Sequence, residues 1–135
     1  MNTPRIEKLE VSAYTIPTDQ PESDGTIKWK STTIVIVEVE AGGKRSLGYS
    51  YADAATAKLI DSKLKGVVLG RSAHSPNECF VEMVKSIRNL GRPGICSMAV
   101  SAVDTSLWDL QAKLLGVPLV RLFGQVREAM PIYGS

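Results

Sequence analysis

Apolar residues in the first part of the chain tend to alternate with polar ones, as on a strand that buries one face. The alternation in Arg5–Pro17 has slips that a bulge would explain, and Pro17 is expected to end this first strand. A β-branched run follows at Thr32–Glu40, the glycines at 42–43 permit a reversal, and Leu47–Tyr51 can pair back. The pattern predicts a three-stranded antiparallel meander.

The period of the apolar residues becomes helical after Asp53. Three helices are expected, over Asp53–Gly66, Ser75–Leu90 and Ile95–Leu115. Ser75 and Glu78 have the spacing of a capping box at the start of the second helix. Small residues gather in the first half of the third helix and indicate close packing against another element; they are Ala99, Ser101, Ala102 and Ser106.

The segment after the third helix is short and apolar. Gly116 and Pro118 are expected to end that helix, and Met130–Tyr133 has the composition of a strand that would need a partner elsewhere. The whole pattern predicts an α+β fold, in which the meander is followed by a bundle of about three helices.

Composition and charge exclude several classes of function. Sixteen basic and fourteen acidic residues leave a net charge of +2, which gives no electrostatic footprint for nucleic acid or an acidic membrane. Cys79 and Cys96 lack the close spacing of a zinc or redox motif, so two free thiols in a reducing cytoplasm are expected. Since no apolar run approaches the roughly 20 residues that cross a bilayer, a soluble protein is expected.

The connection Thr18–Lys30 is polar and nearly free of aliphatic residues, so a long surface loop is expected there. Connections of this length are usually functional or disordered. The segment is therefore the best candidate for binding, with the alternative that its side chains are simply solvated. The side chains that could make such contacts are Asp19, Gln20, Asp24, Lys28 and Trp29.

The most patterned stretch is Ala99–Gly124, AVSAVDTSLWDLQAKLLGVPLVRLFG. Together with the meander that precedes it, this stretch resembles the N-terminal domain of the mandelate racemase and muconate lactonizing enzyme group of the enolase superfamily. Ser106 stands where the family pattern usually has alanine, a small-for-small change. The residues that carry the resemblance include Ala102, Asp104, Leu107, Asp109, Lys113, Gly116, Pro118 and Gly124.

The resemblance implies a capping domain over residues 1–124, then a linker and the first strand of an absent (β/α) barrel over residues 125–135. In this superfamily a Lys or His base removes the proton next to a carboxylate while Mg²⁺ holds the ene-diolate. Those groups project from later barrel strands, so no catalytic residue and no metal ligand is expected here. The parent enzyme would be an acid-sugar dehydratase or a racemase of carboxylic acids, and this chain should be inactive and hold no Mg²⁺ by itself.

The resemblance also implies that Thr18–Lys30 is a lid over the mouth of the barrel, in contact with the distal end of a small carboxylic acid or sugar acid. A second lid segment would include Tyr51, for which packing at a strand end is the alternative. Ser135 matches a position that lines the pocket at the end of a barrel strand.

Two other functions remain open at this point. The chain could be a freestanding interaction module, with homo-oligomers as the expected assembly, or one half of a split enzyme whose barrel is a separate chain. An apolar patch that needs cover would support the first; its residues are Leu119, Leu122, Phe123, Met130, Ile132 and Tyr133.

Asp104 and Asp109 are acidic residues in an otherwise aliphatic helix. Positions five apart lie about 140° apart around the helix axis, so the two carboxylates cannot converge on one substrate atom. Structural roles are therefore expected: Asp109 paired with Lys113 four residues on, and Asp104 accepting hydrogen bonds from loop amides or Arg92.

Two single residues complete the candidates. Trp108 is expected to pack against the meander or the barrel rather than to stack on a ligand. His74, the only histidine, has no acid or cysteine near it in sequence and is expected to be a solvated loop residue.

Overall fold

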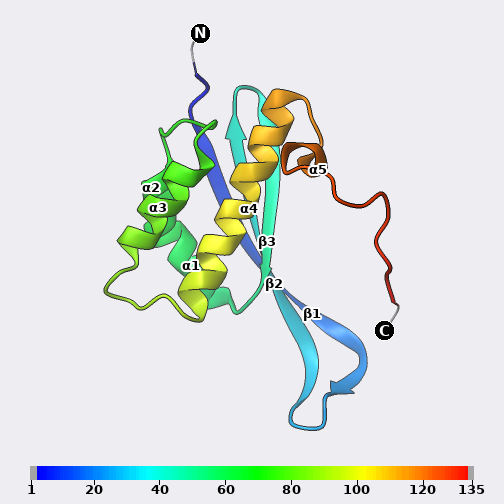
Figure 1. Cartoon of the computed structure of the whole chain (residues 1–135). Coiled ribbons are helices and arrows are strands. Elements are labelled where there is room, and N and C mark those ends of the chain that lie inside the picture. The colour runs from blue at the N-terminus through cyan, green and yellow to red at the C-terminus, as the bar shows by residue number, and fades with distance from the viewer. Residues whose placement is uncertain (1–2, 134–135) are drawn as a thin grey trace.

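The computed structural model describes residues 3–133 and has one three-stranded antiparallel sheet with helices packed on one of its faces (Figure 1). The strands are β1 (Lys8–Ser23), β2 (Lys28–Ala41) and β3 (Lys44–Tyr51), in the order β1-β2-β3. The predicted α+β class and the predicted meander are confirmed.

Alternation along β2 decides which face of the sheet is buried. The side chains of Val35, Val37 and Val39 are fully buried under the helices, whereas Ile34 and Ile36, at alternate positions, point to the opposite face and are only partly buried. Leu9 of β1 lies opposite Val39 and is also buried. The core therefore lies between the sheet and the helical layer.

β1 does not end at Pro17, and Thr18–Lys30 is not a long loop. β1 and β2 stay paired out to Ser23 and Lys28, with a register shift between Pro17 and Glu22, so only the four residues 24–27 turn the chain. The pattern failed here because neither face of this outer part of the hairpin is buried, so no apolar alternation marks it. Its prolines are tolerated because β1 is an edge strand.

The first predicted helix is longer than expected. α1 (Ala54–Leu59), the π-helical turn η1 (Ile60–Leu64) and α2 (Lys65–Val68) follow one another without a break, so Gly66 lies inside the helix instead of ending it. A glycine in a helix costs only about 1 kcal/mol, which the packing of the buried Leu64 and Val68 outweighs. Asp53 caps the start as predicted, because its Oδ1 accepts the N–H of Ala55 at 2.8 Å.

The second predicted helix is α3 (Pro76–Ser86), and it ends before Leu90. The predicted capping box is absent from the described residues, since the Ser75 side chain makes no cap hydrogen bond and Glu78 pairs with Arg71. The third helix, α4 (Ile95–Leu115), has the predicted bounds, and Gly116 ends it in the left-handed conformation at φ 68°.

The C-terminal segment differs from expectation. α5 (Leu119–Leu122) is one short turn, and in the described part of the tail that follows it, residues 124–133, there is no strand. Figure 1 shows this tail running away from α5 toward the end of the molecule where the β1–β2 hairpin projects. A strand needs a neighbouring strand for its backbone hydrogen bonds, and the described residues supply none to this tail.

Candidate functional site

The outer half of the β1–β2 hairpin, residues 17–31, projects past the helical layer (Figure 1). We call this segment the hairpin arm. Nearly all of its side chains are exposed, and Trp29 and Thr18 are partly buried. Five of the predicted site residues, Asp19, Gln20, Asp24, Lys28 and Trp29, lie on it. The arm is therefore a paired and solvent-exposed projection rather than an unstructured loop.

Asp24 organises the tip of the hairpin arm. Its Oδ1 accepts the backbone N–H groups of Thr26 at 2.9 Å and Ile27 at 3.0 Å, and the Thr26 hydroxyl at 2.7 Å. The hydroxyl and then the two amides lower the pKa of this carboxyl from 3.8 to about 2. Because its oxygen is used by its own turn, Asp24 shapes the tip of the arm.

Trp29 is held across the arm by Glu22. The indole Nε1 donates to Glu22 Oε2 at 2.9 Å, and the two residues are partners in the strand register. This hydrogen bond restrains the orientation of an indole ring on an otherwise solvated hairpin. Glu22 was missed by the sequence analysis; its signal, an acid opposite a tryptophan across a hairpin, becomes visible only once the register is known.

The other candidates are placed at separate points along the sheet. Asp19 and Gln20 lie in the segment where the β1–β2 register shifts, and both are exposed. Lys28 is paired with Ser23 beside the tip. Tyr51 ends β3 opposite Ile34, at the base of the arm, and 66% of its surface is exposed. Ser135 lies outside the described residues.

Asp109 joins α4 to the edge of the sheet. Its Oδ2 accepts the backbone N–H of Leu47 in β3 at 2.8 Å and the Lys113 ammonium at 2.7 Å, and Lys113 donates to the Arg45 carbonyl at 3.0 Å. The predicted Asp109–Lys113 pair is confirmed. The pair also occupies hydrogen-bonding groups of β3, an edge strand, which protects that edge from pairing with another chain.

The surroundings of the Asp104 carboxylate differ from those that were predicted. Its Oδ1 is buried and has no hydrogen-bond partner among residues 3–133, so the predicted bonds from loop amides or Arg92 are absent from this part of the chain. Arg92 instead lies over the ring of Phe80, 5.8 Å from the ring centroid. Asp104 lines a cavity of about 190 Å³ between α3 and α4, and burial raises the pKa of its carboxyl above 3.8.

His74 and the two cysteines behave as expected, and Trp108 packs as expected but against a different partner. Trp108 packs against Phe123 with ring centroids 4.9 Å apart, so its partner is α5's end rather than the meander. His74 is exposed in the loop before α3. Cys79 and Cys96 are free and buried, and burial raises the pKa of the Cys79 thiol to about 11.

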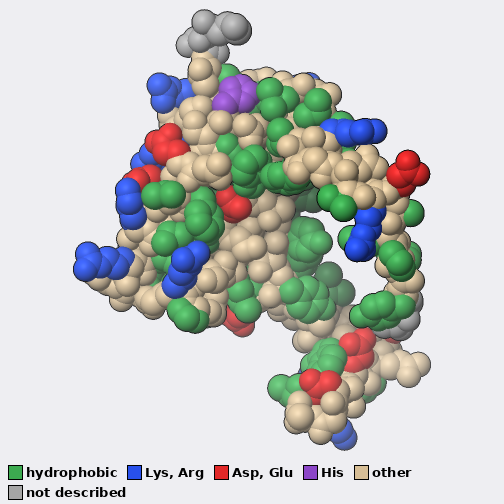
Figure 2. Space-filling view, in the orientation of Figure 1, with side chains coloured by type: hydrophobic (Ala, Val, Ile, Leu, Met, Phe, Trp, Pro, Cys, Tyr) green, Lys and Arg blue, Asp and Glu red, His purple; other side chains and the backbone are tan. Residues whose placement is uncertain are grey.

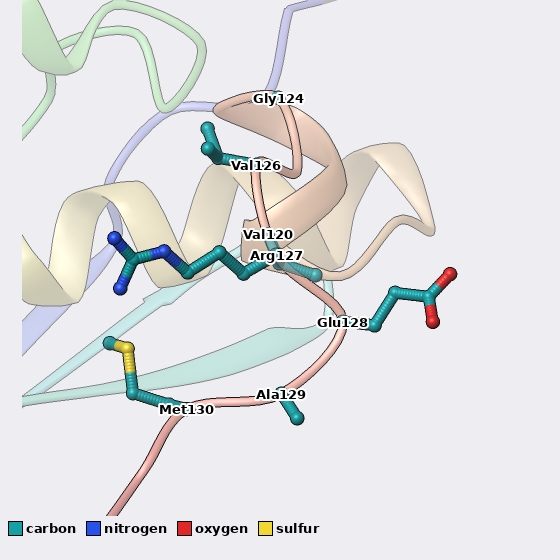
Figure 3. Close-up of a pocket in the computed structure, with 7 residues that line it drawn as sticks. All are labelled: Val120, Gly124, Val126, Arg127, Glu128, Ala129 and Met130. Atoms are coloured by element: carbon teal, nitrogen blue, oxygen red, sulfur yellow. The ribbon is translucent and has the colours of Figure 1, made fainter.

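A crevice of about 550 Å³ lies between α5 and the tail (Figure 3). In Figure 3, Arg127 extends across the space between Val126 and Met130, whereas Glu128 points away from it. Val126 is 91% exposed and Met130 is 73% exposed, so these walls are not held by the rest of the domain. The crevice exists because the tail stands off from the body, and Figure 2 shows the opening between them with hydrophobic side chains at its margins.

The described residues offer neither a metal site nor a membrane-spanning helix. Within residues 3–133, no three His, Cys, Asp or Glu side chains are grouped so that they could hold a metal ion. None of the helices in this part of the chain combines the length and the apolarity that crossing a bilayer requires.

Comparison with known proteins decides the family. Residues 11–124 match the family described as mandelate racemase / muconate lactonizing enzyme, N-terminal domain. The chain belongs to this family. A mandelate racemase/muconate lactonizing enzyme-like protein from Rubrobacter xylanophilus has the same fold, with 55% identity and a TM-score of 0.85 over 87% of this chain and 33% of its own.

Two further relatives have named activities. The 3,6-anhydro-alpha-L-galactonate cycloisomerase of Streptomyces coelicolor is 32% identical over 96% of this chain and 38% of its own length. The L-talarate/galactarate dehydratase of Salmonella typhimurium, whose structure holds Mg and L-lyxarohydroxamate, is 26% identical with a TM-score of 0.80, over 94% of this chain and 35% of its own. The chain thus spans little more than a third of the length of these relatives, and the match places it as their N-terminal domain.

Proposed function

We propose that this chain is the capping domain of an enzyme that removes the proton next to the carboxylate of an acid sugar or a related small carboxylic acid, and that the hairpin arm covers the distal end of that substrate. The observation that carries the proposal is the arm: paired to its tip, projecting past the helices, and exposed, in a member of the mandelate racemase / muconate lactonizing enzyme family. The named relatives, which act on sugar acids, support the substrate class.

The arm's own side chains would bind and orient the substrate. The Lys28 ammonium beside the tip suits a carboxylate, and the exposed amide and carboxylate of Gln20 and Asp19 suit hydroxyl groups. Trp29, restrained by Glu22, supplies an apolar surface that keeps water from the covered site. Tyr51 at the base of the arm would contribute its phenol.

Proton abstraction itself is assigned to no residue of this chain. Mg²⁺ would stabilise the negative charge that develops on the substrate carboxylate. The residues present do not fit a metal centre, since within residues 3–133 no group of three ligating side chains could hold an ion. The proposal therefore limits this chain to binding, orientation and exclusion of water, and expects the base and the metal ligands on a barrel.

A chimeric enzyme tests the proposal. Residues 1–124 would replace the corresponding domain of the Streptomyces coelicolor cycloisomerase, and kcat/KM would be measured on that enzyme's own substrate. Replacing residues 18–30 by a two-residue Asn-Gly turn should lower kcat/KM by about tenfold or more, because the covering contacts are lost. Trp29→Ala should give a smaller loss in the same direction.

A surface change remote from the arm is the control. Asn77→Gln, exposed at the start of α3, should leave kcat/KM of the chimera unchanged. An active chimera whose kcat/KM is indifferent to removal of the arm contradicts the lid role. The isolated chain with Mg²⁺ and sugar acids in D₂O should show no exchange of the α-proton, and exchange above the buffer rate would contradict the assignment of chemistry to a barrel.

A further inference from the structure

The hairpin arm carries different side chains on its two faces. Where the register shifts, residues 18–21 of β1 lie opposite Lys30 alone, so the irregularity belongs to β1 and β2 keeps its alternation. Trp29 therefore shares a face of the sheet with Val35, whereas Lys28 and Lys30 lie on the opposite face. The indole and the two ammonium groups of the arm are thus on different sides.

Glu22 is the cross-strand neighbour of Trp29 on the same face. The register pairs the two residues directly after the irregular segment 18–21, and Glu22 Oε2 accepts the indole Nε1–H at 2.9 Å. Because Lys28 and Lys30 lie on the other face, they do not compete for this carboxylate. The indole nitrogen is the only polar atom of a tryptophan side chain, so this bond uses its whole hydrogen-bonding capacity.

The bond to Glu22 sets the orientation of the ring because little else holds it. The arm projects past the helical layer (Figure 1), and Trp29 is only partly buried. A tryptophan without a tether populates several staggered rotamers, and each change of rotamer swings the ring across the arm. A hydrogen bond at the far edge of the ring selects among these rotamers. The indole therefore has one preferred orientation before any substrate is present.

An ordered ring matters where a substrate is covered. Each side chain that binding immobilises costs affinity, and a ring that is already ordered avoids this cost. Flexible surfaces adapt to ligands of different shape, whereas a fixed surface discriminates between them. A fixed indole on the arm therefore favours one shape at the distal end of a substrate.

We propose that Glu22 is a positioning residue that acts through Trp29. It holds the indole ready for the distal end of the substrate, and so sets the affinity and the discrimination of the hairpin arm for that end. The inference rests on the proposed function, which gives the ring a substrate to cover. Glu22 contributes as a hydrogen-bond acceptor and does not touch the substrate. Its amide analogue should therefore replace it, and its effect should vanish when the indole N–H is absent.

Water-exchange NMR of the purified chain tests the restraint without a barrel. Glu22→Ala should speed hydrogen exchange of the Trp29 indole N–H by about tenfold, and Glu22→Gln, which keeps an acceptor oxygen, should leave it within about threefold of the wild type. The amides of Thr26 and Ile27 should be unchanged, because Asp24 holds them. Equal exchange of the indole N–H in the wild type and Glu22→Ala overturns the inference. Faster exchange of the two tip amides in Glu22→Ala also overturns it, because Glu22 would then hold the hairpin rather than the ring.

Kinetics of the chimeric enzyme test the consequence for the substrate. Glu22→Ala should raise KM for the cycloisomerase substrate about threefold to tenfold and change kcat less than about twofold, since the cost of ordering the ring then falls on binding. Glu22→Gln should restore KM to within about twofold of the unmodified chimera. The matched control is Glu10→Ala, an exposed acid of β1 outside the arm, which should leave KM unchanged. Inhibition by lactate, an α-hydroxy acid too short to reach the arm, should be equal in every variant.

A double-mutant cycle separates positioning from direct contact. In a Trp29→Phe background, where the ring has no N–H, Glu22→Ala should change KM by less than about 1.5-fold. An undiminished effect in that background overturns the inference, because Glu22 would then bind the substrate itself, and so does a Glu22→Gln variant that fails to restore KM. If removal of the arm leaves kcat/KM unchanged, the proposed function and this inference fail together. A chimera that needs the arm but tolerates Glu22→Ala contradicts this inference alone.

Discussion

A Cβ atom added to Gly48 in β3 would lie 2.6 Å from the backbone nitrogen of Ser106 in α4. It would lie only 2.1 Å from the carbonyl oxygen of Ala102, one turn earlier. The backbones of strand and helix are therefore in direct contact at this point. The predicted close packing of the small residues in α4 is confirmed for Ala102 and Ser106, and the buried Ser106 hydroxyl is satisfied by donating to the Val103 carbonyl at 2.7 Å.

Gly48→Ala should strongly destabilise the domain. The atoms that the new methyl group meets are backbone atoms of α4, which cannot move without displacing the helix. We expect a loss of about 3 kcal/mol, at the upper end of the range for overpacking, measured by urea unfolding. Gly66→Ala is the matched control, because its added Cβ meets nothing within 4 Å in a helical segment and should stabilise by about 0.5–1 kcal/mol. Equal effects at the two glycines would contradict the close contact.

Asp109→Ala should cost more than loss of an ordinary surface ion pair. It removes the acceptor of the Leu47 N–H as well as the partner of Lys113, and we expect a loss of about 1–3 kcal/mol. Asp61→Ala is the matched control. It breaks the exposed Asp61–Lys65 ion pair, which has the same four-residue spacing and a distance of 3.5 Å, and it should lower the free energy of unfolding by about 0.5 kcal/mol or less. Hydrogen exchange of the Leu47 amide that is faster in the Asp109 variant alone would identify the lost Leu47–Asp109 hydrogen bond as the cause. Equal unfolding free energies for the two variants would contradict this role of Asp109.

Asp104→Asn should raise the melting temperature at neutral pH. Burial raises the pKa of the Asp104 carboxyl in the folded state above its unfolded value of about 3.9. The cost of burying the charged carboxylate therefore lowers the stability fully at pH values above the folded-state pKa. This cost disappears at pH values below the unfolded pKa, where the carboxyl is protonated in both states. The difference in melting temperature between the Asn variant and the wild type should therefore shrink as the pH falls toward 4, and thermal melting in a pH series measures it. A wild-type protein that melts higher than the variant at pH 7 would indicate that Asp104 has a partner.

Asp24→Ala should loosen the tip of the hairpin arm without unfolding the core. The tip amides of Thr26 and Ile27 lose their acceptor, so their hydrogen exchange should accelerate while the melting temperature changes little. In the wild type, the stabilisation of the tip by the Asp24 carboxylate is fully present above pH 3.8, the ordinary pKa of the group. It is lost as the pH falls through about 2, where the pKa of Asp24 lies in the folded state. An NMR titration of the Asp24 carboxyl checks this value, and a midpoint near 4 would contradict the turn geometry.

Local signals in the sequence were sufficient to predict an element or a contact wherever one chemical requirement of neighbouring residues dominated. The bounds of α4 follow from a long apolar stripe and from Gly116, whose left-handed conformation ends the helix. The pairing of β2 with β3 follows from β-branched alternation and the glycines at the turn. The Asp109–Lys113 pair needed only helical spacing.

Three features of the candidate site could not be predicted, because they depend on contacts between residues that are far apart in the sequence. The hairpin arm carries no apolar alternation because neither of its faces is buried, so its pairing to the tip and the Glu22–Trp29 bond depend on strand register. The bond from Leu47 to Asp109 joins residues 62 apart in the sequence. The lack of a partner for Asp104 within residues 3–133 depends on where α3 and Arg92 lie.

The sequence by itself determined the fold class, the meander, the longest helix and the resemblance to the family, because periodicity and glycine conformation act over a few neighbouring residues. The tertiary structure decided where the chain projects, which aspartate joins helix to strand, and that the tail remains without strand pairing in its described part. The physical reason is that strand pairing, burial of a carboxylate and exposure of a sheet face depend on what lies across the chain in space.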